Sequence, residues 1–337
     1  LIVEPGLTLH AQRWGWSSGY FAFVLLMAGL AIAVLRAAGA GGLSSPVRQS
    51  AAGSAPINWR ERLTWVALAA IPSSLMLGVT TYITTDVASA PFLWVLPLAL
   101  YLLTFIIAFQ AKPLIPPDVT LLVQAAAVAA CAVLLPFDTT NFLIQLFVHL
   151  TAFFLTALMC HQALVGRRPD PAHLTEFYLW MSFGGVVGGG FNAFLAPVLF
   201  DNVWEYPLVL VLSCLARPWG SWKMGPPAWA PLILGTLAAL AAVVAATFIG
   251  PHAGGRTAFA GLSQYDLFDV GLKVCLATAT VCAFLVRGRA LAFFAMIAIL
   301  SIVARASGEL APTTHTWRSF FGVLTQSQPH VSTLGSV

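Results

Sequence analysis

Long apolar segments with almost no charged residues dominate this sequence. A helix needs about 20 apolar residues to cross the hydrocarbon core of a bilayer. Only 8% of the 337 residues are charged, against about a quarter in a typical soluble domain. The clearest segments cover 17–35, 63–83, 90–109, 141–160, 177–199 and 228–249, and shorter ones cover 119–135, 271–286 and 291–304. We therefore predict an all-α fold, a polytopic transmembrane helix bundle that faces lipid.

The charges of the connecting loops test the number of segments. Five alternate loops, 36–62, 110–118, 161–176, 216–227 and 287–290, carry eleven Lys and Arg residues, whereas the loops between them carry only Arg256. Positive loops stay in the cytoplasm, so this asymmetry predicts about ten spans with the basic loops inside. The pattern holds only if the nine-residue segment 207–215 also crosses. The predicted location is the cell's inner (plasma) membrane, which the chain crosses several times.

The chain divides into four parts by composition. Residues 1–35 are an N-terminal stub with a first span, and 36–62, rich in Gly, Ser and Ala, form a flexible cytoplasmic linker. Residues 63–304 form the helix bundle, and 305–337 form a polar tail for which the pattern predicts no fold. The chain starts at Leu1 and shows no signal peptide, so we expect a fragment of a longer protein.

Composition also argues against several classes of function. No run of Lys or Arg provides an electrostatic surface for nucleic acid. The five cysteines lie in or beside apolar segments without a CxxC pair, so we expect packing residues and neither a disulfide framework nor a metal site. The glycines of 184–190 lack the spacing and the strand context of a nucleotide-binding loop, and no cofactor is expected.

Polar residues inside the segments are the candidates for function. Asn141, Gln145 and His149 recur every four residues and share a face with Thr156 and Cys160. They either form hydrogen bonds between helices or line a polar pathway. No Asp, Glu or Arg lies within a predicted span, although coupled transporters often keep such groups at depth.

A second group of polar residues ends the segment 63–83. Thr80, Thr81, Thr84 and Thr85 lead to Asp86. Their hydroxyls either bond to the helix backbone or form an extracytoplasmic vestibule in which Asp86 attracts a cationic solute.

Two further groups follow the segment 141–160. His161, Arg167, Arg168, His173 and Glu176 gather around one cytoplasmic loop, as solvated residues or as a site. Gly184 with Gly188 and Gly185 with Gly189 form overlapping GxxxG pairs, which predict close packing of one helix on another.

Several strings resemble the membrane part of bacterial fused major-facilitator/spermidine-synthase-like proteins. They are residues 71–109, residues 173–218 and, more loosely, the opening VEPGLTLHAQRWGWSSGY. RSFFGVL (318–324) is similar to the junction at which the synthase domain of that family begins. The resemblance implies that an aminopropyltransferase domain of Rossmann type follows, which transfers an aminopropyl group to a polyamine. After Leu324 neither a glycine-rich loop nor paired acidic residues follow, so no catalytic residue is carried over.

Three functions remain open at this stage. The chain is a transporter-like module that handles a polyamine or another small cation, a non-transporting membrane anchor of a synthase-like enzyme, or a remnant without activity. Ten spans put the tail outside the cytoplasm, where a synthase would lack its cytosolic cofactor. Either 291–304 does not cross the membrane or the following domain is not a cytosolic synthase.

Overall fold

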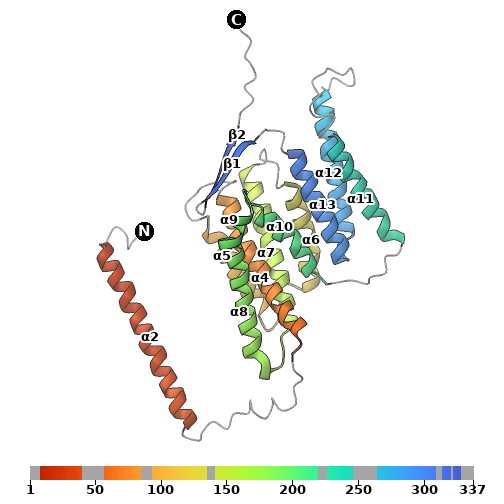
Figure 1. Cartoon of the computed structure of the whole chain (residues 1–337). Coiled ribbons are helices and arrows are strands. Elements are labelled where there is room, and N and C mark those ends of the chain that lie inside the picture. Colours follow the sequence, from red (N-terminus) through yellow and green to blue (C-terminus); the bar gives the residue numbers. More distant parts are fainter. Residues whose placement is uncertain are drawn as a thin grey trace. The chain divides into compact units, whose positions relative to one another are not determined.

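The computed structural model describes residues 8–39, 57–84, 93–134, 141–218, 226–245, 264–308, 313–319 and 322–327, and the elements are labelled in Figure 1. The longer helices are α2 (Leu9–Gly39), α4 (Trp59–Tyr82), α5 (Val95–Ala108), α6 (Pro117–Leu134), α7 (Phe142–Gly166), α8 (Leu174–Gly190), α11 (Pro226–Val244), α12 (Gln264–Leu285) and α13 (Ala290–Gly308). The shorter elements are η3 (Pro171–His173), the π-helix η4 (Phe191–Leu195), α9 (Ala196–Leu199), α10 (Glu205–Ser213), η5 (Cys214–Ala216), β1 (Thr313–Ser319) and β2 (Gly322–Ser327).

The predicted helical class is confirmed, and each predicted segment contains a helix. Within the described ranges, four helical segments are long and apolar enough to cross a membrane: Trp59–Tyr82, Pro117–Leu134, Leu143–Gly166 and Pro171–Leu199. Five shorter apolar helices accompany them, including Glu205–Ala216. Asn58 begins α4 by accepting a hydrogen bond from the Arg60 amide, and Asn141 begins α7 in the same way through Leu143.

The chain forms two compact units. The first, Leu1–Pro56 with Asp170–Ala172, is built on α2, whose large apolar side chains are exposed, Trp16 and Leu26 among them. The second unit, Ile57–Pro169 and His173–Val337, contains the helices from α4 to α13 and the β1–β2 hairpin. The predicted linker falls largely at 40–56, which lies outside the described residues.

The second unit buries polar groups and exposes apolar ones. Gln124, His149 and Thr156 are fully buried, whereas Phe147 is 71% exposed and Val186 is 70% exposed. A water-soluble domain has the opposite distribution, because unpaired apolar surface is costly in water. Helices with this inverted burial suit a lipid bilayer, where apolar side chains face hydrocarbon and polar ones find partners inside.

Helices α4 and α8 pack closely against each other. A Cβ at Gly184 would lie 2.5 Å from the carbonyl oxygen of Val66, and one at Gly188 would overlap the carbonyl of Ala70. Gly185 has nothing within 4 Å of its Cβ position, and Gly189 has only ordinary contacts. The pair Gly184 and Gly188 therefore lets the two backbones meet, while Gly185 and Gly189 do not.

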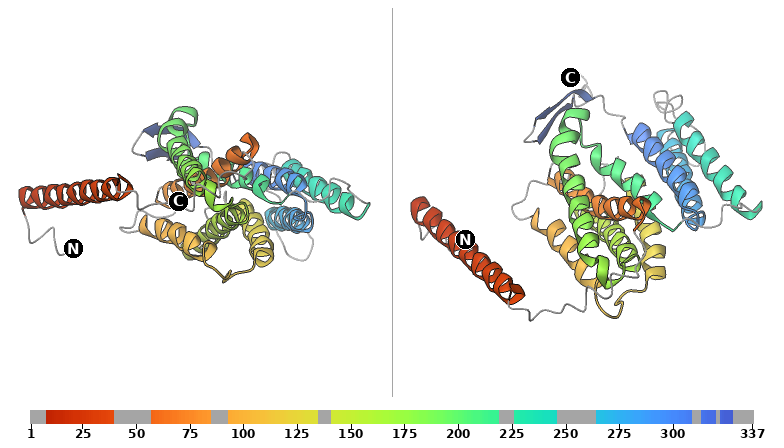
Figure 2. Two further views of the ribbon diagram at one scale, coloured as in Figure 1. Left: turned by 90° about the horizontal axis from the view of Figure 1, so that it is seen from below. Right: turned by 60° about the horizontal axis from the view of Figure 1, so that its bottom comes forward.

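The last three helices lie side by side, with α11 and α12 packed together and α13 contacting both (Figures 1 and 2). After them, residues 313–319 and 322–327 of the tail form two strands, although the sequence pattern predicted no fold there. Strands β1 and β2 pair antiparallel, with Trp317 opposite Leu324 and Arg318 opposite Val323. The tail therefore adds a two-stranded hairpin to the helical fold.

Candidate functional site

The centre of the second unit holds a polar cluster supplied by four helices. His149 comes from α7, Tyr206 from α10, Cys131 from α6 and Tyr82 from α4, and all four are buried. His149 Nδ1 lies 3.0 Å from the Tyr206 hydroxyl and 3.2 Å from Cys131 Sγ. The thiol and the hydroxyl lie 3.4 Å apart, which closes a triangle. We call these four residues the central cluster.

Two tyrosine rings lie beside the imidazole of the central cluster. The Tyr82 ring centroid is 4.6 Å from that of His149, and the ring stacks on Tyr206 at 5.3 Å. His149 Nε2 is buried and has no hydrogen-bond partner among the described residues. It offers a donor or an acceptor according to the tautomer, beside two aromatic faces. His149 Nε2 is therefore a buried polar atom without a partner, next to two aromatic rings.

The predicted stripe on α7 separates into two roles. Asn141 is exposed, and its side chain accepts the Leu143 amide at 2.9 Å as a helix cap. Gln145 and His149 face the interior, at 6% and 0% exposure. Further along the helix, Thr156 accepts a hydrogen bond from Gln124 of α6 at 3.3 Å. Part of the stripe therefore makes contacts between helices, and its first member caps its own helix.

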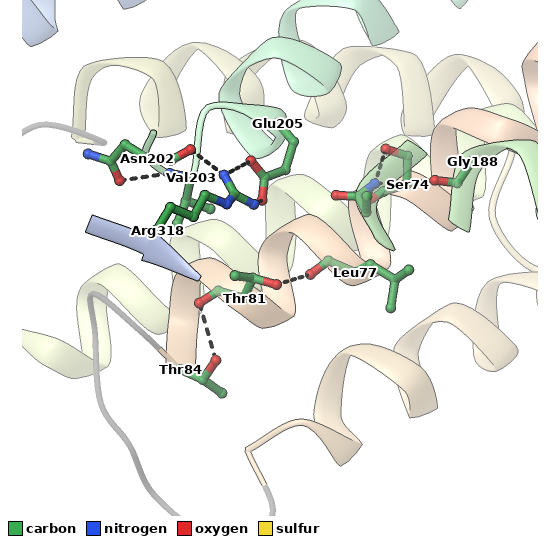
Figure 3. Close-up of polar contacts among 10 residues, drawn as sticks. Ser74, Leu77, Thr81, Thr84, Gly188, Asn202, Val203, Glu205 and Arg318 are labelled. Atoms are coloured by element: carbon green, nitrogen blue, oxygen red, sulfur yellow. Dashed lines mark hydrogen bonds and ion pairs between the residues drawn. The ribbon is translucent and has the colours of Figure 1, made fainter. Parts of the chain in front are cut away.

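The threonines at the end of α4 bond to their own helix. Thr80 donates to the Met76 carbonyl at 2.6 Å and Thr81 to the Leu77 carbonyl at 3.0 Å. Thr84 donates to the carbonyls of Thr80 and Thr81, the first at 2.8 Å. Figure 3 shows the hydrogen bond from Thr81 to Leu77 and the one from Thr84 to Thr81. Thr85 and Asp86 lie outside the described residues.

A contact that the sequence did not predict joins α4 to the π-helix η4. The Asn192 amide donates to the hydroxyl of Ser74 at 2.5 Å, to its carbonyl at 3.1 Å and to the Gly188 carbonyl at 3.2 Å. Ser73 donates to the Gly185 carbonyl at 2.9 Å. π-Turns often mark functional positions, but no local sequence signal distinguishes this asparagine from a loop residue.

The predicted cytoplasmic-edge group is divided between two environments. Glu176 accepts from Arg62 at 2.5 Å and from the Trp180 indole at 3.3 Å, and His173 precedes it at the start of α8. His161 is instead fully buried, with Nδ1 2.9 Å from the Thr104 hydroxyl. The centroid of its ring also lies 3.7 Å from the centroid of the Phe105 ring. His161 therefore contacts α5, whereas Glu176 pairs with the start of α4.

Side-chain contacts also join the predicted basic loops to one another. Arg167, after α7, binds Glu61 at 3.2 Å, so the loops before α4 and after α7 meet. Gln162 donates to the Ile115 carbonyl at 2.8 Å, which adds the loop before α6. Together with the Arg62–Glu176 pair, these contacts gather three basic loops at one end of the bundle.

Arg217 joins the other two basic loops to this end. It is 5% exposed and donates to the Leu121 carbonyl at 3.1 Å, to the Gln124 side chain and to the Arg287 carbonyl at 3.3 Å. Its guanidinium also lies 5.0 Å from the Phe293 ring. Burial lowers the pKa of Arg217 from its usual value, and these acceptors stabilise the positive charge of its guanidinium.

A buried ion pair links the tail to the bundle (Figure 3). Arg318 of β1 donates to both carboxylate oxygens of Glu205, at 2.7 Å and 2.9 Å, and to the Asn202 carbonyl. The side chains of Arg318 and Glu205 are 7% and 2% exposed. Sequence reasoning missed this pair because the residues are over a hundred positions apart and no local pattern relates them.

In the part of the chain that the structure describes, no group of three or more His, Cys, Asp or Glu residues is arranged to hold a metal ion. Comparison with known proteins found no matching family model, no matching curated protein and no matching solved structure.

Proposed function

We propose that this chain is a multi-pass protein of a bacterial inner membrane, with ten membrane segments and its basic loops in the cytoplasm. The inverted burial and the four long apolar helices support a bilayer environment. The contacts that join the five basic loops support a common side for them. The short segment α10–η5 counts as a crossing because Arg217 at its end belongs to the basic loops, while Glu205 at its start follows a loop that carries Asp201 and no Lys or Arg.

For its activity we propose a transporter-like module that handles a small organic cation, with a polyamine as the first candidate because of the family resemblance. The observation that carries this proposal is the central cluster. It places His149, with one ring nitrogen lacking a partner, beside the rings of Tyr82 and Tyr206 where four helices meet. Aromatic ring faces attract organic cations without carrying a negative charge themselves, which suits a bundle with few carboxylates.

A second candidate is a non-transporting anchor for a synthase-like domain. The hydroxyls of Thr80, Thr81 and Thr84 favour it, because all three are occupied by carbonyls of their own helix. In this case the polar residues stabilise the bundle and move nothing across it.

Flux measurements separate the two candidates. The full chain is reconstituted into liposomes, and uptake of labelled putrescine and spermidine is compared with protein-free liposomes. A transporter gives saturable uptake, which H149A reduces at least tenfold while T81V leaves it within twofold. T81V is the matched control, because valine has nearly the shape of threonine and the lost hydroxyl bonds only to its own helix. Uptake equal to that of empty liposomes would rule out transport of these amines and leave the anchor or a remnant without activity.

A further inference from the structure

The Glu205–Arg318 pair shows where the β1–β2 hairpin of the tail docks on the bundle, and it also bears on stability. Two charged groups almost free of solvent contact are costly unless their hydrogen bonds are satisfied. Here both carboxylate oxygens of Glu205 and the carbonyl of Asn202 accept hydrogen bonds from the guanidinium of Arg318. Val323, opposite Arg318 on β2, packs against the apolar core of the bundle. Polar and apolar contacts therefore hold the hairpin in one docked position.

The two ends of α10–η5 belong to different groups of loops. Arg217 follows this segment and binds residues next to the basic loops. Glu205 begins it, after a loop that carries Asp201 and no Lys or Arg. The hairpin contacts Glu205 and Asn202, so it lies with the acidic loop, at the end of α10–η5 opposite to Arg217.

We propose that the β1–β2 hairpin is a cap on the non-cytoplasmic end of the bundle, fastened by Arg318 to Glu205. The chain between the two residues passes through α10, α11, α12 and α13. Contact between its ends requires an even number of crossings, which four crossings satisfy. This inference rests on the proposed orientation of the basic loops. With α10–η5, α11 and α12 as three crossings, an even total requires that α13 crosses as well. The residues after the hairpin then lie outside the cytoplasm.

Cysteine labelling of the full chain in intact bacteria tests the side of the hairpin. Trp317 lies on β1 and is 55% exposed, and Trp59 begins α4 at the basic end and is 60% exposed. Each is replaced by Cys in turn, and the wild-type chain gives the background of its native cysteines, of which Cys131, Cys160, Cys214 and Cys282 are buried. A membrane-impermeant maleimide should label W317C in intact cells and W59C only after permeabilisation.

The other outcomes are distinguishable. If both positions are labelled only after permeabilisation, or both are labelled in intact cells, the hairpin lies on the same side as the basic loops. Either result overturns the cap. Labelling of W59C alone in intact cells overturns the proposed orientation, and with it the non-cytoplasmic position, although the two ends remain opposite.

Charge exchange tests the fastening. E205A and R318A each leave a buried charge unpaired and should lower the melting temperature in detergent, whereas E205R/R318E should recover part of the loss. E205L/R318L, which removes both charges, should melt closer to the wild type than either single variant does. The exposed pair Glu61–Arg167 provides the control, since E61A should shift melting little. Single variants that melt like the wild type would overturn the role of the pair.

Discussion

The hydroxyl of Tyr206 is the residue-scale feature that organises the central cluster, because it lies within hydrogen-bond distance of both His149 and Cys131. We expect Y206F to lower the free energy of unfolding by about 1 kcal/mol, since a hydrogen bond between membrane helices contributes roughly this amount. Unfolding by a denaturing detergent in bicelles measures the loss. Y178F serves as the control, because Tyr178 is 38% exposed on α8, and it should stay within about 0.5 kcal/mol of the wild type. Equal losses in the two variants would contradict this role of the hydroxyl.

At the scale of elements, the contact between α4 and α8 depends on two glycines of one helix face. G184A and G188A should each destabilise the protein by about 1–3 kcal/mol, because the added methyl meets the backbone of α4 and a backbone cannot move aside like a flexible side chain. The same unfolding measurement applies.

G185A is the matched control on the neighbouring face. Its Cβ would meet nothing within 4 Å, and alanine favours a helix over glycine by up to about 1 kcal/mol. Its stability should therefore stay unchanged or rise. A loss in G185A as large as that in G188A would show that glycine at this position acts through something other than the α4 contact.

At the scale of the whole molecule, Arg217 holds together helices from distant parts of the chain. It joins η5 to α6 and to the turn between α12 and α13. R217A should lower the free energy of unfolding by about 1–3 kcal/mol, since it leaves the buried oxygen of Gln124 without this donor. R168A removes an exposed arginine from the same end of the bundle and should change stability by less than about 0.5 kcal/mol. Similar losses in both would point to the net charge of the loops as the cause.

The sequence alone determined the helical class and the positions of the helices, and of its polar candidates on α7 it named two that are buried, Gln145 and His149. Helix positions are readable because a lipid environment demands long apolar segments, a requirement that acts on neighbouring residues. The GxxxG pattern pointed to helix packing, but Gly184 with Gly185 looked equivalent in it. Only the contact with α4 distinguishes them, because it depends on which face of α8 meets the neighbour.

Only the tertiary structure decided which polar residues meet. His149 lies with Tyr206 and Cys131, while His161, twelve residues later, lies against Thr104 and Phe105. The hairpin and its Glu205–Arg318 pair were equally invisible in the sequence. The physical reason is that local patterns report how a segment interacts with its surroundings, whereas such pairs depend on how distant helices pack, which no local pattern records.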